Sequence, residues 1–140
     1  MGTQTINILN GEIKTNSTNR DYYAIYASSP TKVYMSGGKL NAPTASGIFF
    51  NNSGSLFNMS GGEIFAGASN SYGFRTSYYN QTINLTGGEI NTPGEGAYGI
   101  YAANGATINF YDGIIVAPEK RAIYGTVGAV PTGYGIQKTN

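Results

Sequence analysis

The stretch Thr82-Ile83-Asn84-Leu85-Thr86-Gly87-Gly88-Glu89-Ile90 decides the expected fold. Apolar residues alternate with polar ones up to the glycine pair, which is the two-residue period of a strand with one buried face. Glycine tolerates a positive φ, so the pair can end that strand in a tight bend. Ile90 then resumes the apolar pattern. The stretch therefore predicts two short strands joined by a bend.

The same pattern occurs in four more places along the chain. These copies are Ile6-Asn7-Ile8-Leu9-Asn10-Gly11-Glu12-Ile13, Val33-Tyr34-Met35-Ser36-Gly37-Gly38-Lys39-Leu40, Phe57-Asn58-Met59-Ser60-Gly61-Gly62-Glu63-Ile64 and Ile108-Asn109-Phe110-Tyr111-Asp112-Gly113-Ile114-Ile115. The second turn residue is glycine at 11, 38, 62, 88 and 113, so successive copies are 27, 24, 26 and 25 residues apart. Each step is expected to be one coil of a repeat protein.

A second motif follows each bend. Its central apolar residue lies 10 to 14 residues after the turn glycine, in Ala24-Ile25-Tyr26, Gly47-Ile48-Phe49, Gly73-Phe74-Arg75, Gly99-Ile100-Tyr101 and Ala122-Ile123-Tyr124. Turn-forming residues recur five positions after the turn glycine, at Asn16, Pro43, Gly67, Pro93 and Pro118. Each coil is thus expected to hold two or three short strands.

Strands this short, each buried on one face, cannot enclose a core until they stack on the next copy. Stacking in register predicts four inward columns, which begin at Ile6, Ile8, Ile13 and Ile25 and repeat once per coil. A helical solenoid is the rival interpretation, and the Gly-Gly bends and proline corners oppose it. We expect an all-β fold: a single-stranded parallel β-helix, or β-solenoid, of about five coils.

Residues 1–140 are expected to form a single β-helix domain, a fragment of a longer protein. Residues 3–124 hold the repeat coils. Residues 125–140 depart from the repeat, although Gly133-Tyr134-Gly135-Ile136 echoes the second motif. This segment is expected to be either a partial coil or a C-terminal cap, because solenoid ends expose strand edges that proteins usually cover.

The repeat units resemble those of bacterial surface β-helices. The likeness is carried by Thr82-Ile83-Asn84-Leu85-Thr86-Gly87-Gly88-Glu89-Ile90 followed by Ala97-Tyr98-Gly99-Ile100-Tyr101-Ala102, and it extends over about residues 5 to 125. The units are similar to those of autotransporter passenger domains and related adhesins, which are pectin-lyase-like solenoids. The resemblance implies a right-handed, three-faced β-helix, a secreted or cell-surface location and use as a stalk or adhesive rod. It supplies no catalytic motif, and phage tailspikes and polysaccharide lyases share the coil pattern.

Composition excludes several classes of function. Charged residues make up 11% of the chain and the formal net charge is +1, so no basic field is present to hold nucleic acid. No apolar run is long enough to insert this segment into a membrane. Cysteine and histidine are both absent, which removes disulfides, thiolate nucleophiles, imidazole bases and most transition-metal sites. We expect no cofactor and no metal.

One outward column is the best candidate for a binding strip. The position beside the fourth inward column is occupied by Tyr26, Phe49, Arg75, Tyr101 and Tyr124. We name these five residues the aromatic ladder. Aromatic faces can stack on sugar rings, and arginine can lie against aromatic faces by cation–π contact. The alternative is that the ladder only supports the sheet through contacts between coils. A second outward column, Asn7, Tyr34, Asn58, Asn84 and Asn109, is expected to hydrogen-bond along the stack.

The charged residues show no catalytic cluster. Glu63 and Glu89 should lie on neighbouring coils, where they could form an acid and base pair, but exposure is the expected state of both. We therefore expect no enzyme. The leading hypothesis is a non-enzymatic structural or adhesive segment of a bacterial cell-surface or secreted protein. The alternatives are a carbohydrate-binding module that uses the aromatic ladder and a phage tail-fibre or tailspike segment. Expected partners are a host or surface receptor or glycan, and a second copy joined end to end.

Overall fold

The computed structural model describes residues 2–119 and 121–128, and every regular element within them is a strand. In chain order the strands are β1 (Gln4–Ile8), β2 (Glu12–Lys14), β3 (Tyr23–Ala27), β4 (Thr31–Met35), β5 (Lys39–Ala42), β6 (Ser46–Phe50), β7 (Leu56–Met59), β8 (Glu63–Ala66), β9 (Tyr72–Thr76), β10 (Thr82–Asn91), β11 (Tyr98–Ala102), β12 (Thr107–Val116), β13 (Ile123–Tyr124) and β14 (Thr126–Val127).

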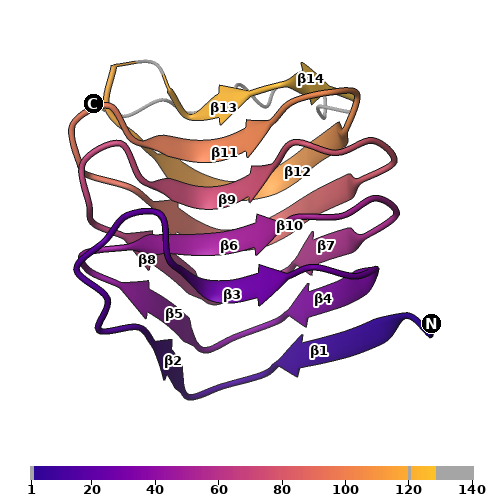
Figure 1. Ribbon diagram of the computed structural model, residues 1–140, viewed down its shortest axis with the longest axis horizontal. Helices are drawn as coiled ribbons and strands as arrows, with labels where there is room; N and C mark the ends of the chain where they lie inside the picture. The colour runs from indigo at the N-terminus through magenta and orange to yellow at the C-terminus, as the bar shows by residue number, and fades with distance from the viewer. Residues whose placement is uncertain (1, 120, 129–140) are drawn as a thin grey trace.

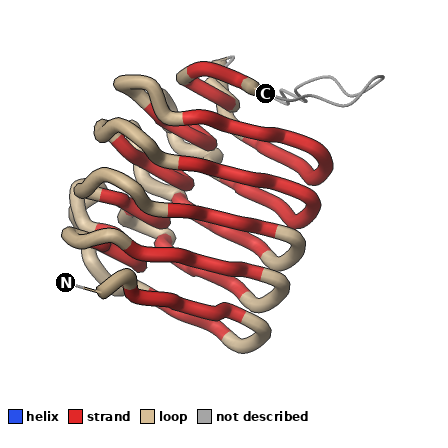
Figure 2. The backbone as a smooth tube through the Cα atoms, turned by 90° about the vertical axis from the view of Figure 1, so that its right-hand side faces the viewer, coloured by secondary structure: helices blue, strands red, loops and turns tan. Residues whose placement is uncertain are grey.

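The strands form two sheets in which every pairing is parallel. One sheet has the order β1-β4-β7-β10-β8-β5-β2, with β12 paired to β10 and β14 to β12. The other has the order β13-β11-β9-β6-β3. We call them sheet A and sheet B. The chain rises from one coil to the next along a right-handed path, with the bends of sheet A stacked along one side (Figures 1 and 2). The fold is the predicted parallel β-solenoid of about five coils.

The register between coils is the one that the repeat predicts. Val33 pairs with Ile6 on one side and with Phe57 on the other, and Phe57 pairs in turn with Ile83. The fourth column pairs in the same way from Ile25 to Ile123. Because the side-chain period of a strand is two, this register turns every predicted apolar column toward the interior.

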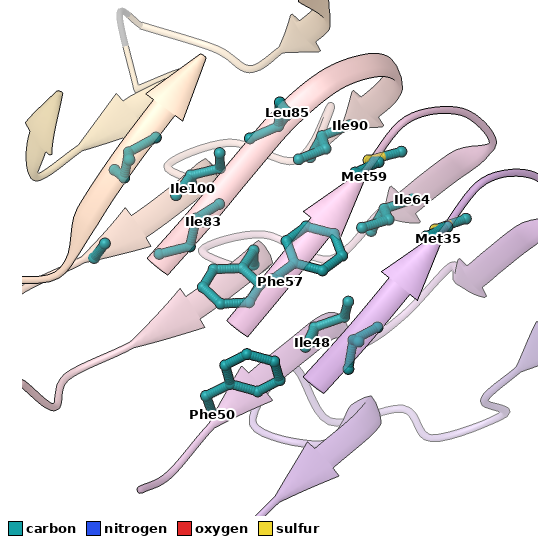
Figure 3. Packing of buried hydrophobic residues seen from close by; sticks show 14 of the residues in the cluster. Met35, Ile48, Phe50, Phe57, Met59, Ile64, Ile83, Leu85, Ile90 and Ile100 are labelled. Atoms are coloured by element: carbon teal, nitrogen blue, oxygen red, sulfur yellow. The ribbon is translucent and has the colours of Figure 1, made fainter. Parts of the chain in front are cut away.

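The interior is one continuous apolar core. Phe57 and Phe74 face each other across it, with ring centroids 5.1 Å apart and planes 8° apart, and Phe50 meets Phe74 edge to face. Figure 3 shows how side chains from successive coils fill the space between the two sheets. Ile13 belongs to a predicted core column but is 38% exposed, because it lies in the first coil and only its upper neighbour covers it.

The two glycines of the bend have different roles. The second has a positive φ in every coil, as in Gly62 at +84°. The first is needed for a close approach between coils, since a Cβ on Gly61 would lie 2.5 Å from the carbonyl oxygen of Ser36 in the coil below. The expectation of a positive φ thus holds for the second position. At the first position, steric crowding against the coil below explains why the residue is glycine.

A hydrogen-bonded turn precedes sheet B in every coil. In each case an N–H donates to the carbonyl oxygen three residues earlier, as Ala97 does to Gly94 at 3.0 Å and Arg121 to Pro118 at 3.0 Å.

At the C-terminal end of the described stack, Thr126 and Val127 pair with Thr107 and Ile108 and so begin a further coil. The expected partial coil or cap, residues 125–140, lies mostly outside the described residues.

Candidate binding surfaces

The structure brings the aromatic ladder together on the outer face of sheet B. Tyr26 pairs with Phe49, and Phe49 pairs with Arg75. Arg75 then pairs with Tyr101, which pairs with Tyr124. Tyr26 and Tyr124, at the two ends, are 54% and 50% exposed, and the three middle members are partly buried. The predicted column exists as a continuous row of side chains.

A second row of side chains lies beside the ladder and was not predicted. It consists of Tyr23 on β3, Tyr72 on β9, Tyr98 on β11 and Arg121 just before β13. Strand alternation alone would turn Tyr72 inward together with Phe74. Instead, Gly73 faces the core in the place of Tyr72, and Phe74 remains in the core. A Cβ on Gly73 would meet Ile90 at 2.4 Å. The Tyr-Gly pairs at 72–73 and 98–99 were the signal for this row.

Arg75 lies at the centre of the two rows. Its guanidinium carbon is 4.9 Å from the ring centroid of Phe49 and 4.9 Å from that of Tyr72, and Nη1 donates a hydrogen bond to the Tyr23 hydroxyl at 3.0 Å. Its Nε is buried and has no hydrogen-bond partner. Among the residues that the structure describes, no carboxylate forms an ion pair with Arg75. Aromatic faces therefore stabilise this cation.

The environment of Arg75 shifts two pKa values. Burial raises the pKa of Tyr23 above its ordinary value of 10.0, and the hydrogen bond and positive charge of Arg75 oppose part of that rise. Burial is also the largest single influence on the pKa of Arg75 and lowers it. The hydrogen bond to Tyr23 and the surrounding tyrosine hydroxyls act in the other direction, and the pKa of Arg75 is raised on balance.

The ring faces of the ladder and of the second row are largely occupied by members of the same two rows. Tyr101 and Tyr124 stack with centroids 4.7 Å apart and planes 8° apart, and Tyr72 and Tyr98 stack at 6.0 Å. Arg121 lies over the ring of Tyr98 at 5.1 Å. A sugar ring that stacks on an aromatic residue needs a free face, so this geometry favours support of the sheet. The ladder as a binding strip stays a prediction.

The outer face of sheet A carries the expected amide column. Asn84 donates from Nδ2 to the side-chain oxygen of Asn58 at 2.7 Å, and Asn109 donates to Asn84 at 2.8 Å. Beside this amide row lies a shallow hollow of about 410 Å³ whose lining includes Tyr34, Asn58, Asn84 and Tyr111. The hollow was not predicted from the sequence. The register between β10 and β12 is irregular next to Tyr111, which lines it.

The two carboxylates considered for catalysis have ordinary surroundings. Glu63 and Glu89 pair in register on β8 and β10, as expected, but both are half-buried and not exposed as the sequence predicted, because each lies between two neighbouring coils. Glu63 forms an ion pair with Lys39 at 3.1 Å, and the two side chains are 35% and 38% exposed. Pairs that remain this accessible to solvent contribute at most about 1 kcal/mol. Within residues 2–119 and 121–128, no group of three or more acidic residues is placed to hold a metal ion.

The first coil presents an open edge. Within the described part of the chain, β1, β2 and β3 each pair with one strand only, on the side of the second coil. Leu9 is 68% exposed there, and a hollow of about 290 Å³ is lined by residues 6–10, 12 and 13. Unpaired N–H and carbonyl groups on such an edge are available to another strand.

A search of protein-family models, of curated proteins and of solved structures finds no match to this chain. Among the described residues, no helix has the length and apolar character needed to cross a membrane. The class of protein is therefore defined by the fold itself: a parallel β-solenoid built of imperfect repeats.

Proposed function

We propose that this chain is a non-enzymatic structural or adhesive segment of a bacterial cell-surface or secreted protein, similar to an autotransporter passenger or adhesin. The observation that supports the proposal most is the unbroken stack of coils in register around one core. Neighbouring coils in such a stack are about 4.8 Å apart, so five coils make a stiff rod of about 24 Å. A rod of this kind acts as a spacer and carries its contacts on its outer faces.

The absence of enzymatic activity can be tested with a panel of polysaccharides. We expect no release of reducing ends and no unsaturated product from the unmodified protein, because Glu63 is paired with Lys39 and both are partly exposed. Hydrolase or lyase activity that is lost in Glu63→Gln or Glu89→Gln, and kept in the control Glu12→Gln, would overturn the proposal.

The surface location needs a separate test. An antibody raised against this chain is expected to label intact cells of the source bacterium or its secreted fraction. Labelling only after the cells have been broken would contradict the location.

Self-association is the second part of the proposal. The edge formed by β1 and β2 is unpaired among the described residues, and Glu12-Ile13-Lys14 is self-complementary in charge. Antiparallel pairing of β2 with β2 of a second copy would place Glu12 opposite the copy's Lys14. Sedimentation velocity is expected to show a dimer. Ile13→Lys should abolish the dimer, because an inward-pointing charge blocks pairing at a strand edge, and the control variant Thr5→Lys should still form it. A strictly monomeric protein at high concentration would contradict this partner.

A further inference from the structure

The hollow on the outer face of sheet A has the features of a built ligand site. It extends over four neighbouring strands: Tyr34 comes from β4, Asn58 from β7, Asn84 from β10 and Tyr111 from β12. Three steps between coils correspond to about 14 Å, a length suited to a short chain of small rings. The volume of about 410 Å³ lies within the range of small-molecule sites.

The hydrogen-bonding groups of the hollow are held in place before any ligand arrives. Asn84 donates one N–H to Asn58 and accepts one hydrogen bond from Asn109. A carboxamide has two N–H donors and an oxygen with two lone pairs, so Asn84 keeps one donor and one acceptor for a ligand. The hydroxyl of Thr86 donates to the carbonyl oxygen of Met59 at 3.4 Å and keeps lone pairs that can accept from a ligand. Alternating donors and acceptors fixed in this way match the hydroxyl groups of a sugar.

The hollow also contains two tyrosine rings that take no part in the ring contacts of the aromatic ladder. Among the described residues, no ring stacking, edge-to-face contact or cation–π contact involves Tyr34 or Tyr111. Tyr111 is 41% exposed, and Tyr34 is partly buried. A tyrosine presents an apolar ring and a polar hydroxyl together, which is the combination that a saccharide needs.

The charge of the lining selects among saccharides. The residues that line the hollow are tyrosine, asparagine, serine, threonine and Met59, and none of them is an acidic or basic residue. A carboxylate or sulfate group placed there would lose solvation without gaining a cationic partner among the lining residues. An uncharged ligand incurs no such loss.

We propose that this hollow binds a neutral saccharide. Tyr34 and Tyr111 contact its ring faces, and the amides of Asn58 and Asn84 hydrogen-bond its hydroxyl groups. The site does not depend on the proposed structural role, because the rod stands whether or not the hollow is filled. It would give an adhesive rod a specific contact.

The test uses the full chain on a printed array of neutral hexose and N-acetylhexosamine oligosaccharides, beside sialylated and uronic-acid glycans. We expect binding to neutral glycans, weakened about tenfold or more when Tyr34→Ala and Tyr111→Ala are combined. The matched control combines Tyr26→Ala and Tyr124→Ala, which removes two exposed tyrosines of the ladder and should leave binding unchanged. Thermal unfolding must show that both double variants are folded. If Tyr34→Ala unfolds the protein, Thr86→Val serves in its place and should also weaken binding.

Nuclear magnetic resonance gives a readout at the site itself. Titration with the neutral glycan that binds best on the array should shift the side-chain amide signals of Asn58 and Asn84 and leave the Asn51 side-chain signal, beside Tyr26, in place. The proposal is overturned if no neutral glycan binds at millimolar concentration or if acidic glycans bind more tightly. Loss of binding in the ladder variant alone would place the site on sheet B. None of these outcomes bears on the absence of polysaccharide cleavage, which tests the structural role.

Discussion

Truncation of Phe57 tests the continuity of the core. The side chain is completely buried and lies 5.1 Å from the ring of Phe74 on the opposite sheet. Burial of a phenylalanine contributes about 1.5–3 kcal/mol, and the cavity left by its removal raises the usual cost of Phe→Ala to about 3–5 kcal/mol. Because Phe57 pairs with Val33 below and Ile83 above, the cavity would open between three coils.

Urea unfolding followed by circular dichroism measures this cost. We expect Phe57→Ala to lower the free energy of unfolding by about 3–5 kcal/mol. Tyr124→Ala is the matched control, because it removes an aromatic ring that is 50% exposed, and its cost should stay within about 1.5 kcal/mol. Equal losses in the two variants would refute the interior position of Phe57.

Three further predictions concern crowding, buried polar groups and pH. Gly73→Ala should lower the free energy of unfolding by about 1–3 kcal/mol, because its Cβ would lie 2.4 Å from a core methyl group; a neutral effect in urea unfolding would contradict the close approach. Ser55→Ala should lower the free energy of unfolding by about 1–3 kcal/mol, because the buried Ser55 hydroxyl accepts from the N–H of Thr31 and donates to the side-chain oxygen of Asn52. Ser28→Ala, at an exposed serine, is the control, and equal stability of the two variants would refute the buried network. Burial raises the pKa of Tyr23 in the folded protein above its ordinary value of 10.0. The contribution of the neutral Tyr23 hydroxyl to stability is therefore complete below pH 10.0 and is lost as the pH rises through the higher folded value. Ultraviolet titration of Tyr23→Phe should lack a late-ionising tyrosine, and an unchanged alkaline titration curve would contradict the shift.

The sequence predicted the core of this fold well because the repeat and the strand period carry the same information. The bend glycines locate one coil after another, and alternation of apolar residues then assigns each column to the interior. Both depend only on local sequence. The register from Ile6 to Ile108 follows from them without knowledge of the structure.

The outer surfaces were less predictable, because they depend on departures from regular alternation. Gly73 faces the core and thereby turns Tyr72 outward beside Arg75, which strict alternation does not anticipate. The extra residue at Tyr111 shifts the register of β12, and Tyr111 lines the hollow. The occupied faces of the aromatic ladder are likewise a property of side-chain packing, which the sequence pattern does not contain.

Cysteine cross-linking tests the stacking of coils in register most directly, and the chain has no cysteine of its own. Thr82 pairs with Thr107 across neighbouring coils, so their Cα atoms should lie about 4.8 Å apart, within disulfide reach. Thr82 and Asn109 are offset by two positions, which places their Cα atoms about 8 Å apart and outside that reach. Under mild oxidation, the protein with Thr82→Cys and Thr107→Cys is expected to form an intramolecular disulfide, and the protein with Thr82→Cys and Asn109→Cys is not. Efficient cross-linking of the offset pair with none in the paired positions would contradict the solenoid register.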